Sequence, residues 1–522
     1  MRFSKPIKSS AHCVPSPDGT LVATLAQSNI TIRAADSLRT IRKIKLSPEI
    51  SGGVSNFSWS PSSSRILMTA VDQLHVFAVP TGDFHASVRI PTSLGTKSTF
   101  VDFGATDNEV CIWSPFGIKL TIVALAPSKA VEITNPKLYT ALSASRGCSF
   151  RPETLHMALL TRTAGKDMIS IHTPGTRELQ RSWTPDTIDA QGLAWTPDGR
   201  WLAVWESPSQ GHRVLFYTSD GHLFKDWRGP ISHAPVDMGL EYGAGVRLLQ
   251  FSPNGRHAAV ADGSRGVCVL NGQSLVEEMR LRHNQTIQPK DTLQIWQEEA
   301  KLPNAGAGPT TFVKADQAVM PPVSPSANAQ DARSGCNLAK FDFSSSLLAT
   351  RLEEAPSTVW IWDVPTCELR AVLIYHANVS KIDWHPTQPE LLLIRCEGER
   401  YAGLVFVWDP LSHGPRSIDF THHLLGENLS GKVNATWLGN IAESATLFFA
   451  DCASWVLLSL AETDDSLSWQ EQSGLNKQTD YDSLSDLIPA PRKADTNSDM
   501  DEDMSELGEA DDTFYFKKRL VP

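Results

Sequence analysis

Short apolar stretches that end in polar turns recur along the whole chain. Residues 357–366 (STVWIWDVPT) alternate β-branched residues with tryptophans and stop at an aspartate. Residues 404–410 (LVFVWDP) repeat this pattern and end on Trp-Asp followed by a proline. β-Branched and aromatic residues favour strands, whereas Asp and Pro favour tight turns. Each stretch is therefore predicted to be a strand that ends in a turn.

A second pattern precedes each of these stretches: an alternating strand, a polar turn and another apolar strand. It reads AKFDFSSSLLATR at residues 339–351 and KIDWHPTQPELLLI at residues 381–394. Related phrases, such as LAWTPDGRWLAVW at 193–205 and LQFSPNGRHAAVA at 249–261, bring the number of copies to nine. The positions that we align as equivalent are Pro15, Trp59, Phe103, Phe150, Trp195, Phe251, Phe343, Trp384 and Trp437.

The spacing of these nine positions indicates the fold. Five of the eight intervals lie between 41 and 47 residues. A WD-type blade, in which four antiparallel strands form one radial sheet, takes about 40–45 residues. The predicted fold is therefore all-β, a WD-repeat β-propeller of about nine four-stranded blades in which each Trp-Asp pair ends a third strand. A single closed ring is favoured, because a division into four and five blades would give two unusually small rings; a smaller ring with extra blades stays open.

Two segments interrupt the repeat and set the predicted domain boundaries. Residues 1–270 hold blades one to six, and residues 335–462 hold blades seven to nine. Residues 271–334, whose second half is rich in Ala, Pro, Gly and Gln, are predicted to form a mostly flexible insertion with one short strand at 292–296. Residues 463–522 carry 15 acidic and 6 basic residues and are predicted to form a disordered acidic tail.

The first eight residues (MRFSKPIK) precede the inner strand of the first blade. A strand formed there would lack a partner within its own blade, and an unpaired edge exposes backbone hydrogen-bonding groups. We therefore predict that residues 1–8 add a strand to the last blade and close the ring.

Charge argues against a nucleic-acid partner. The formal net charge is −11, of which the tail contributes −9, so the propeller body is nearly neutral. Binding DNA or RNA usually requires a basic footprint that neutralises phosphates. Residues 39–45 (RTIRKIK) are locally basic, and we interpret them as an exposed strand with solvated side chains; a basic docking face is the alternative.

The cysteines and the hydropathy pattern exclude further classes. The eight cysteines have neither a CxxC pair nor metal-ligand spacing, which predicts reduced, mostly buried thiols and no metal site. No run of 18 apolar residues is present, so neither a membrane span nor a membrane partner is predicted. The first residues also lack the apolar stretch of a signal peptide.

Catalytic motifs are absent from the sequence. We find no Gly-x-Ser-x-Gly elbow, no phosphate-binding loop, no His-Glu-x-x-His and no Gly-x-Gly-x-x-Gly that enters a helix. No catalytic residue, cofactor or small-molecule substrate is therefore predicted. His376 stands 33 residues before Asp409, where WD blades place a histidine that bonds the Asp-bearing turn, so a buried structural hydrogen bond is expected. Ser324, which precedes Pro325 in the predicted insertion, is a candidate site for proline-directed phosphorylation.

The motif residues are thus expected to be structural. The tryptophans of the two Trp-Asp stretches should be buried between neighbouring blades, and the aspartates should hold the turns. The predicted structural blade residues are Trp360, Trp362, Asp363, His376, Trp408 and Asp409.

The nine-copy layout, the insertion after the sixth copy and three phrases point to a family. The phrases are DAQGLAWTPDGRWLAVWES at 189–207, FDFSSSLLATRLEEAPSTVWIWD at 341–363 and AVLIYHANVSKIDWHPTQPELLL at 371–393. Over roughly residues 1–460 the chain resembles WD-repeat protein eight, the WD-repeat family of the centrosome and spindle pole body. The acidic tail has no counterpart in this resemblance.

The resemblance implies a non-enzymatic adaptor at the microtubule-organising centre. It implies anchoring of microtubule minus ends and assembly of the mitotic spindle, in a complex with a coiled-coil anchoring protein and a minus-end-directed kinesin of the kinesin-fourteen class. Gamma-tubulin-associated pole components are further implied partners. The implied location is the cytoplasm and cytoskeleton at the spindle pole body, with nuclear access during mitosis. No ligand-binding residues carry over, because the shared motif residues are structural.

Two other interpretations stay open. A translation-initiation-factor-like propeller should carry basic extensions for the ribosome, whereas this tail is acidic. A substrate adaptor of a ubiquitin ligase should carry a helical docking motif outside the blades, and none is found in the sequence.

Overall fold

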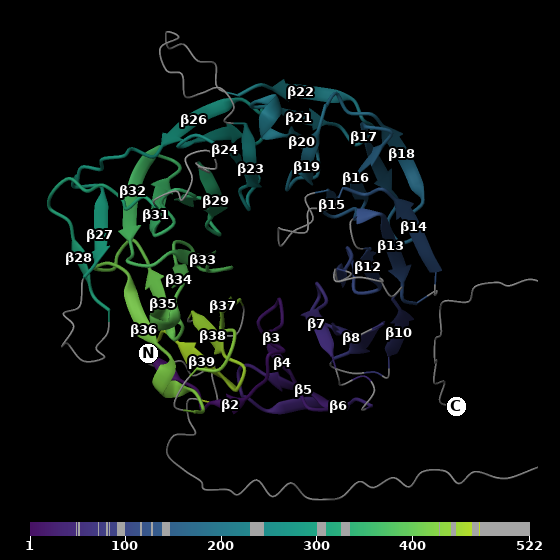
Figure 1. Ribbon diagram of the computed structural model, residues 1–522, viewed down its shortest axis with the longest axis horizontal. Coiled ribbons are helices and arrows are strands. Elements are labelled where there is room, and N and C mark those ends of the chain that lie inside the picture. The colour runs from purple at the N-terminus through teal and green to yellow at the C-terminus, as the bar shows by residue number, and fades with distance from the viewer. Residues whose placement is uncertain are drawn as a thin grey trace, which may run out of the picture.

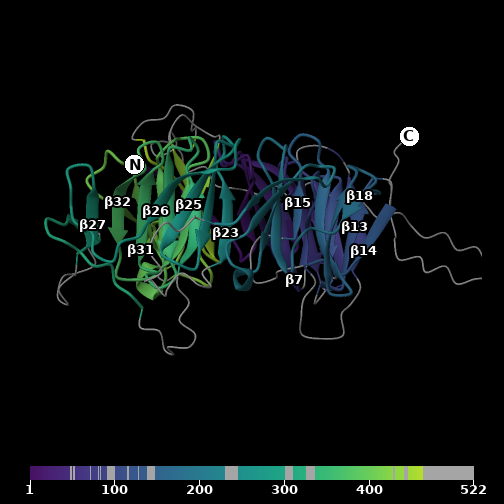
Figure 2. The ribbon, with the colours of Figure 1, turned by 90° about the horizontal axis from the view of Figure 1, so that it is seen from above.

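The computed structural model is one ring of nine radial β-sheets (Figure 1). The structure describes residues 1–47, 50, 53–70, 72–79, 82, 84–90, 100–114, 117–126, 129–137, 147–229, 245–299, 310–324, 335–426, 429–439, 445–461 and 469. Seen from above, the sheets stand side by side in a disc (Figure 2). The prediction of an all-β propeller with nine blades in a single ring is confirmed.

Blades one to three each hold four antiparallel strands in sequence order. The innermost strand comes first in the chain and the outermost strand comes last. Blade one consists of β3 (Cys13–Pro15), β4 (Leu21–Ala26), β5 (Asn29–Ala34) and β6 (Thr40–Lys45). Blade two consists of β7 (Val54–Trp59), β8 (Arg65–Ala70), β9 (Gln73–Ala78) and β10 (His85–Arg89). Blade three consists of β11 (Phe100–Phe103), β12 (Glu109–Trp113), β13 (Lys119–Ala124) and β14 (Lys129–Thr134).

Blades four to six repeat this arrangement. Blade four consists of β15 (Cys148–Phe150), β16 (Met157–Thr163), β17 (Lys166–His172) and β18 (Leu179–Trp183). Blade five consists of β19 (Ala190–Trp195), β20 (Leu202–Glu206), β21 (Val214–Tyr217) and β22 (Leu223–Trp227), with the 3-10 helix η2 (Pro208–Gln210) between its second and third strands. Blade six consists of β23 (Val246–Phe251), β24 (His257–Asp262), β25 (Gly266–Asn271) and β26 (Glu277–Arg282).

Blade seven has six strands, because the insertion adds two at its outer edge. These are β27 (Gln294–Glu298), which runs parallel to the outermost regular strand, and β28 (Phe312–Lys314). The regular strands are β29 (Cys336–Phe341), β30 (Leu347–Leu352), β31 (Thr358–Asp363) and β32 (Glu368–Ile374). The insertion therefore begins after Arg282, at the end of blade six, and not at residue 271 as predicted. The predicted strand at 292–296 overlaps β27.

Blades eight and nine complete the ring. Blade eight consists of β33 (Val379–Trp384), β34 (Leu392–Cys396), β35 (Leu404–Trp408) and β36 (Arg416–Asp419), with the 3-10 helices η3 (Glu399–Tyr401) and η4 (Thr421–His423). Blade nine consists of β37 (Asn434–Leu438), β38 (Thr446–Ala450) and β39 (Ser454–Ser459). Its outer strand comes from the N-terminus, as β1 (Arg2–Phe3) and β2 (Ile7–Lys8).

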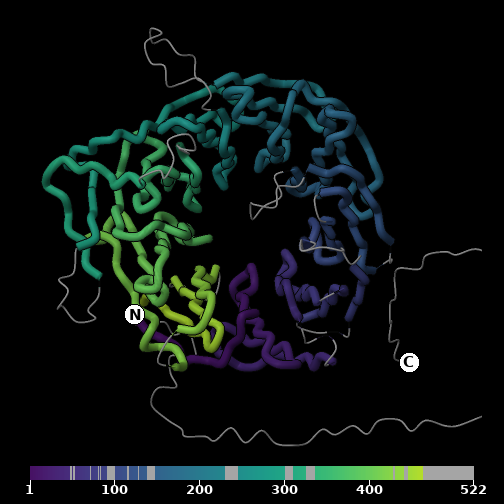
Figure 3. Tube along the Cα trace, viewed as in Figure 1, coloured from purple at the N-terminus to yellow at the C-terminus, as the bar shows by residue number. Residues whose placement is uncertain are grey.

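Ring closure joins the two ends of the folded chain. Both β1 and β2 pair antiparallel with β39, with Arg2 opposite Ser459 and Ile7 opposite Trp455. In the tube trace, the purple N-terminal residues lie beside the yellow-green strands of this blade (Figure 3). The predicted closure by residues 1–8 is confirmed, and it removes the edge that β39 would otherwise expose.

The polar turns within two of the blades have the backbone conformation that their glycines favour. Gly199 and Gly255, in the Pro-Asp-Gly and Pro-Asn-Gly triplets, have φ of 67° and 69°. Such left-handed φ values suit glycine because it lacks a Cβ atom. Each triplet joins the first and second strands of its blade, as the sequence predicts.

One predicted equivalence is wrong by two residues. Phe343 was aligned with the other first-strand positions, but its side chain is 51% exposed. Phe341 holds that position instead, since it is buried and pairs with Leu348 as Phe251 pairs with Ala258. Asp342 then starts the hairpin turn, in which its backbone N donates to Leu347 O at 2.9 Å.

Candidate functional site

The Trp-Asp residues of blades seven and eight occupy the predicted places. Trp362 and Trp408 lie at the ends of third strands and are 4% and 0% exposed, which confirms their predicted burial. Trp360 is also fully buried. After each strand the aspartate holds the turn: Asp363 Oδ1 accepts the backbone N–H of Thr366, and Asp409 Oδ1 accepts that of Leu411. These residues therefore build the blades.

A buried hydrogen-bond chain links blade seven to the connection that precedes it. His283 Nε2 lies 2.8 Å from Thr350 Oγ1, which accepts the Nε1–H of Trp362, also at 2.8 Å. His283 Nδ1 lies 2.9 Å from the carbonyl oxygen of Arg265 and must carry the ring proton, because a carbonyl can only accept. The neutral Nε2 then accepts the Thr350 hydroxyl proton. Burial lowers the pKa of His283 to about 4, which favours this neutral tautomer.

His283 plays the part that the sequence assigned to His376. The expected buried bond from His376 to the Asp409 turn is wrong, because the His376 side chain is exposed. Its backbone N–H instead donates to Glu298 Oε2 at 2.9 Å. The insertion separates His283 from blade seven in the sequence, so a search based on ordinary blade spacing could not find it.

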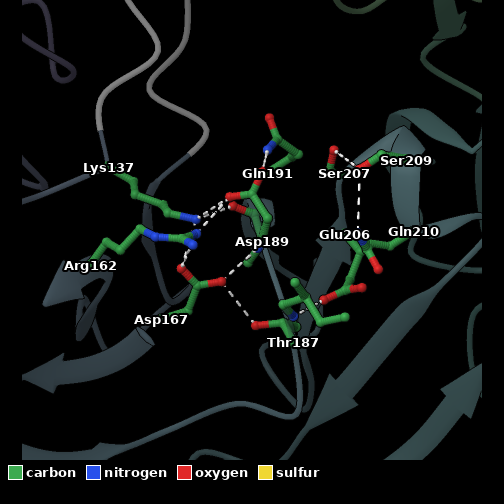
Figure 4. Close-up of polar contacts among 12 residues, drawn as sticks. Lys137, Arg162, Asp167, Thr187, Asp189, Gln191, Glu206, Ser207, Ser209 and Gln210 are labelled. Carbon is green, nitrogen blue, oxygen red and sulfur yellow. Dashed lines mark hydrogen bonds and ion pairs between the residues drawn. The ribbon is translucent and has the colours of Figure 1, made fainter. Parts of the chain in front are cut away.

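A polar cluster joins blades three, four and five (Figure 4). Lys137 Nζ contacts Asp167 Oδ1 at 2.7 Å and Asp189 Oδ1 at 2.9 Å. Arg162 Nη1 contacts the same two carboxylates at 3.2 and 2.8 Å. All four residues lie in or beside connections between blades or between second and third strands, and these connections share one face because the strands are antiparallel.

The charges of this cluster are balanced internally. The side chain of Asp167 is fully buried, and its second oxygen accepts from Thr187 Oγ1 and from the backbone N of Ala190. Partial burial acts to raise the pKa of Asp189, but hydrogen bonds and charge from Lys137, with Arg162, lower it overall. Two cations and two carboxylates leave no net charge for a ligand. We conclude that the cluster fastens neighbouring blades.

The insertion is fastened to two blades through Glu298. This side chain is buried at the end of β27, and Tyr401 of blade eight donates its hydroxyl to Glu298 Oε1 at 2.8 Å. Burial and this hydrogen bond both raise the pKa of Tyr401. Ser417 Oγ also donates to Thr310 O at 2.8 Å. The described part of the insertion is thus built into the ring.

Trp469 is a residue that sequence reasoning missed. It lies within the predicted tail, yet it is 6% exposed and packs in the cluster between blades nine and one, with Leu38, Trp455 and Ile7. The described chain therefore remains in contact with the propeller beyond the predicted tail boundary at residue 463. The rest of the predicted tail, residues 463–468 and 470–522, lies outside the described residues.

The structure also places Ser324, the cysteines and the basic segment at residues 39–45. Ser324 is exposed, and its backbone N–H donates to Glu354 O at 2.8 Å, while Pro325 lies outside the described residues. All eight cysteines are free, five of them buried and Cys367 exposed. Residues 39–45 fall mostly on β6, where Lys43 and Lys45 point to solvent.

The described residues hold no group of three or more His, Cys, Asp and Glu side chains that could bind a metal ion. Nor does the described part of the chain contain a helix that is long and apolar enough to cross a membrane. A shallow groove of about 780 Å³ lies on the rim between β22 and β26. Its apolar lining includes Trp227, Val276 and Met279, and Lys225 and Glu277 lie among its charged residues.

Comparison with known proteins supports the repeat assignment. The chain is 24% identical over 441 residues to the WD repeat-containing protein WRAP73 of Mus musculus, covering 78% of this chain and 87% of that protein. It is 23% identical over 399 residues to an uncharacterized WD repeat-containing protein of Schizosaccharomyces pombe, covering 74% and 76%. The chain is thus similar to WD-repeat proteins over most of its length. No family model matches it.

Three solved structures are similar to this chain at low identity. A eukaryotic initiation factor is 11% identical with a TM-score of 0.48, covering 78% of this chain and 87% of that one. The Dos1 propeller is 10% identical with a TM-score of 0.47, covering 80% and 94%. The dihydro-heme d1 dehydrogenase NirN is 11% identical with a TM-score of 0.45, covering 79% and 75%.

Proposed function

We propose that this WD-repeat protein is a non-catalytic scaffold at the microtubule-organising centre. There it would help to anchor microtubule minus ends and assemble the mitotic spindle, together with a coiled-coil anchoring protein and a minus-end-directed kinesin of the kinesin-fourteen class. Gamma-tubulin-associated components would be further partners. The proposed location is the spindle pole body, in the cytoplasm and, during mitosis, the nucleus.

One observation carries the proposal. The phrases at 341–363 and 371–393, which resemble the centrosome and spindle pole family, form strands of blades seven and eight. They form the part of the ring into which the insertion is built. The similarity to WRAP73 extends over 78% of the chain, so it includes most of the ring and not one isolated repeat. A rigid ring with two faces and a rim can hold several partners at once without chemistry of its own.

The rim groove between β22 and β26 is the surface that we assign to the coiled-coil partner. An amphipathic helix presents an apolar stripe flanked by charges of both signs. The groove offers the complementary pattern, since Val276 and Met279 lie beside Lys225, Glu277 and Arg280. The Val276 side chain is 50% exposed, so it is available to a partner and its replacement should not unfold the ring.

Affinity purification of the tagged full chain from mitotic cells, followed by mass spectrometry, tests this function. We expect a coiled-coil protein and a kinesin. Recovery of ribosomal subunits would instead favour the initiation-factor-like alternative, and cullin components would favour the ubiquitin-ligase adaptor. The variant Val276→Glu should lose the coiled-coil protein at least fivefold.

Leu411→Glu is the matched control, because Leu411 is also an exposed apolar residue, at 91%, but lies in blade eight away from the groove. Equal recovery of the coiled-coil protein with both variants would refute the groove assignment. Absence of the tagged chain from the spindle pole would refute the proposed function as a whole.

A further inference from the structure

The outer strands of blades nine and one carry a set of exposed cationic side chains. Residues 1–47 contain eight Lys and Arg but only two acidic residues, Asp18 and Asp36. Asp18 is engaged in the first hairpin turn, where it bonds Ser16 and Thr20. Six of the basic side chains are exposed, and we call this set the basic rim: Arg2, Lys5, Lys8, Arg39, Lys43 and Lys45.

The two halves of the basic rim lie on neighbouring blades. β1 and β2 form the outer strand of blade nine, and β6 forms that of blade one. One hydrophobic cluster joins them, because Ile7 of β2 and Leu38, just before β6, both belong to it. Figure 1 shows β2 and β6 along the same edge of the ring.

Trp469 packs into this same cluster, so this residue lies at the joint that connects the two halves of the basic rim. The C-terminal segment that follows is strongly acidic. Residues 495–512 hold nine Asp and Glu and no Lys or Arg. The acidic residues 495–512 therefore follow, along the chain, a residue that is anchored beside the basic rim.

We propose that the acidic block at 495–512 docks on the basic rim of its own chain. The 25 residues between Trp469 and Asp495 span roughly 25–30 Å if they behave as a flexible linker. Tethering at such a distance gives an effective concentration in the millimolar range. Each exposed ion pair contributes little, so docking depends on many pairs together and weakens as salt screens them.

Docking in this way would regulate the rim. An acidic partner can bind the basic rim only if it displaces the tail. Its negative charge must therefore bind the rim more strongly than the negative charge of the tail does. This inference does not depend on the proposed location or partners of the protein.

Zero-length carbodiimide cross-linking of the full chain, with the links mapped by mass spectrometry, tests the proposal. We expect links from acidic residues 495–512 to Lys8, Lys43 and Lys45 in about 50 mM salt, and a several-fold loss in about 500 mM salt. Because positions 43 and 45 can then no longer form links themselves, the double variant K43E/K45E is assessed at Lys8, where it should reduce the links at least fivefold. Its melting curve should stay unchanged, because both side chains are exposed.

The control K129E/K166E changes two exposed lysines of blades three and four and should leave the links intact. Links spread evenly over all lysines, no links to the rim, or equal losses in both double variants would overturn the proposal. A mixture of light and isotopically heavy chains separates docking within a chain from docking between chains. Predominantly mixed pairs would overturn docking in the same chain. Trp469→Ala should lower the yield of cross-links between residues 495–512 and the basic rim at least twofold. An unchanged yield of these cross-links would overturn the anchoring role of Trp469.

Discussion

Arg177 and Glu109 form a two-point ion pair across the joint between blades three and four. Arg177 Nε donates to Glu109 Oε2 at 2.7 Å, and its Nη2 donates to Oε1 at 3.0 Å. Both side chains are buried, with 2% and 6% exposed. Removing two charges from water costs free energy. Once both are buried, the attraction of each charge to the other offsets that cost.

The single variant Arg177→Met should therefore destabilise the ring by about 3–5 kcal/mol, because it leaves the Glu109 carboxylate buried without its partner. Chemical denaturation gives the free energy of unfolding. The double variant Glu109→Leu with Arg177→Met should recover much of the loss, since neither charge then remains. A loss below about 1 kcal/mol in the single variant would show that solvent reaches this pair.

Replacing Trp362 and Trp408 separates the two roles of a blade tryptophan. Either substitution to Ala should cost about 3–5 kcal/mol, because a large buried side chain is lost. Substitution to Phe should cost about 1 kcal/mol more at Trp362 than at Trp408. The reason is that Trp362 Nε1 donates to Thr350, whereas Trp408 Nε1 has no hydrogen-bond partner among the described residues. Equal costs for the two Phe variants would contradict a role for the His283–Thr350–Trp362 chain.

Deleting residues 1–8 should lower the melting temperature by several degrees. The deletion removes β1 and β2, which pair with the outer edge of β39, and also Ser4, whose Oγ accepts the backbone N–H of Leu457 at 2.9 Å. The bare edge should also promote association between chains, which size-exclusion chromatography would detect. An unchanged melting curve and elution volume would mean that the ring does not need this closure.

Stability should fall as the pH falls from about 6.5 towards 4. Burial lowers the pKa of His283 to about 4, so the unfolded chain binds a proton in this range before the folded chain does. The lost stability amounts to as much as about 1.4 kcal/mol per pH unit for one histidine. His283→Gln should be less stable at pH 7 but should lose less between pH 7 and 5. His222→Gln, at an exposed histidine, is the control and should follow the unaltered chain.

A chain that ends at Ala461 should melt at a lower temperature than one that ends at residue 470. Only the shorter chain lacks Trp469, whose burial fills the joint between blades nine and one. Loss of a buried Trp costs about 3–5 kcal/mol.

The chain that ends at residue 470 should keep the spindle pole signal if the propeller, and not the tail, directs its location. Loss of that signal in a folded chain that ends at 470 would make the acidic tail the targeting element.

Sequence pattern predicted the repeated parts of the ring and missed the parts that are unique. The nine hairpins recur, so each copy supports the others, and even the N-terminal closure follows from an unpaired strand. Phe343 was misplaced because Phe341 and Phe343 both fit a period of two, and only the turn formed by Asp342 distinguishes them. Glu298 and Tyr401 lie 103 residues apart and belong to no repeat, so no repeat spacing in the sequence predicts their hydrogen bond. Trp469 stands alone in a polar segment, where no periodic neighbour marks it as buried.

Closure of the last blade by the first residues of the chain sets an order of events during synthesis. Arg2 and Ile7 leave the ribosome before the other residues of the ring, yet their partners on β39 are among the last residues of the ring to be made. Eight blades can form while the nascent chain grows, but the joint between blades nine and one must wait until residue 459 has emerged. Throughout translation the N-terminal strand is therefore without its partner. A ribosome that stalls before the ninth blade leaves an open arc whose two end sheets are free to pair with other chains.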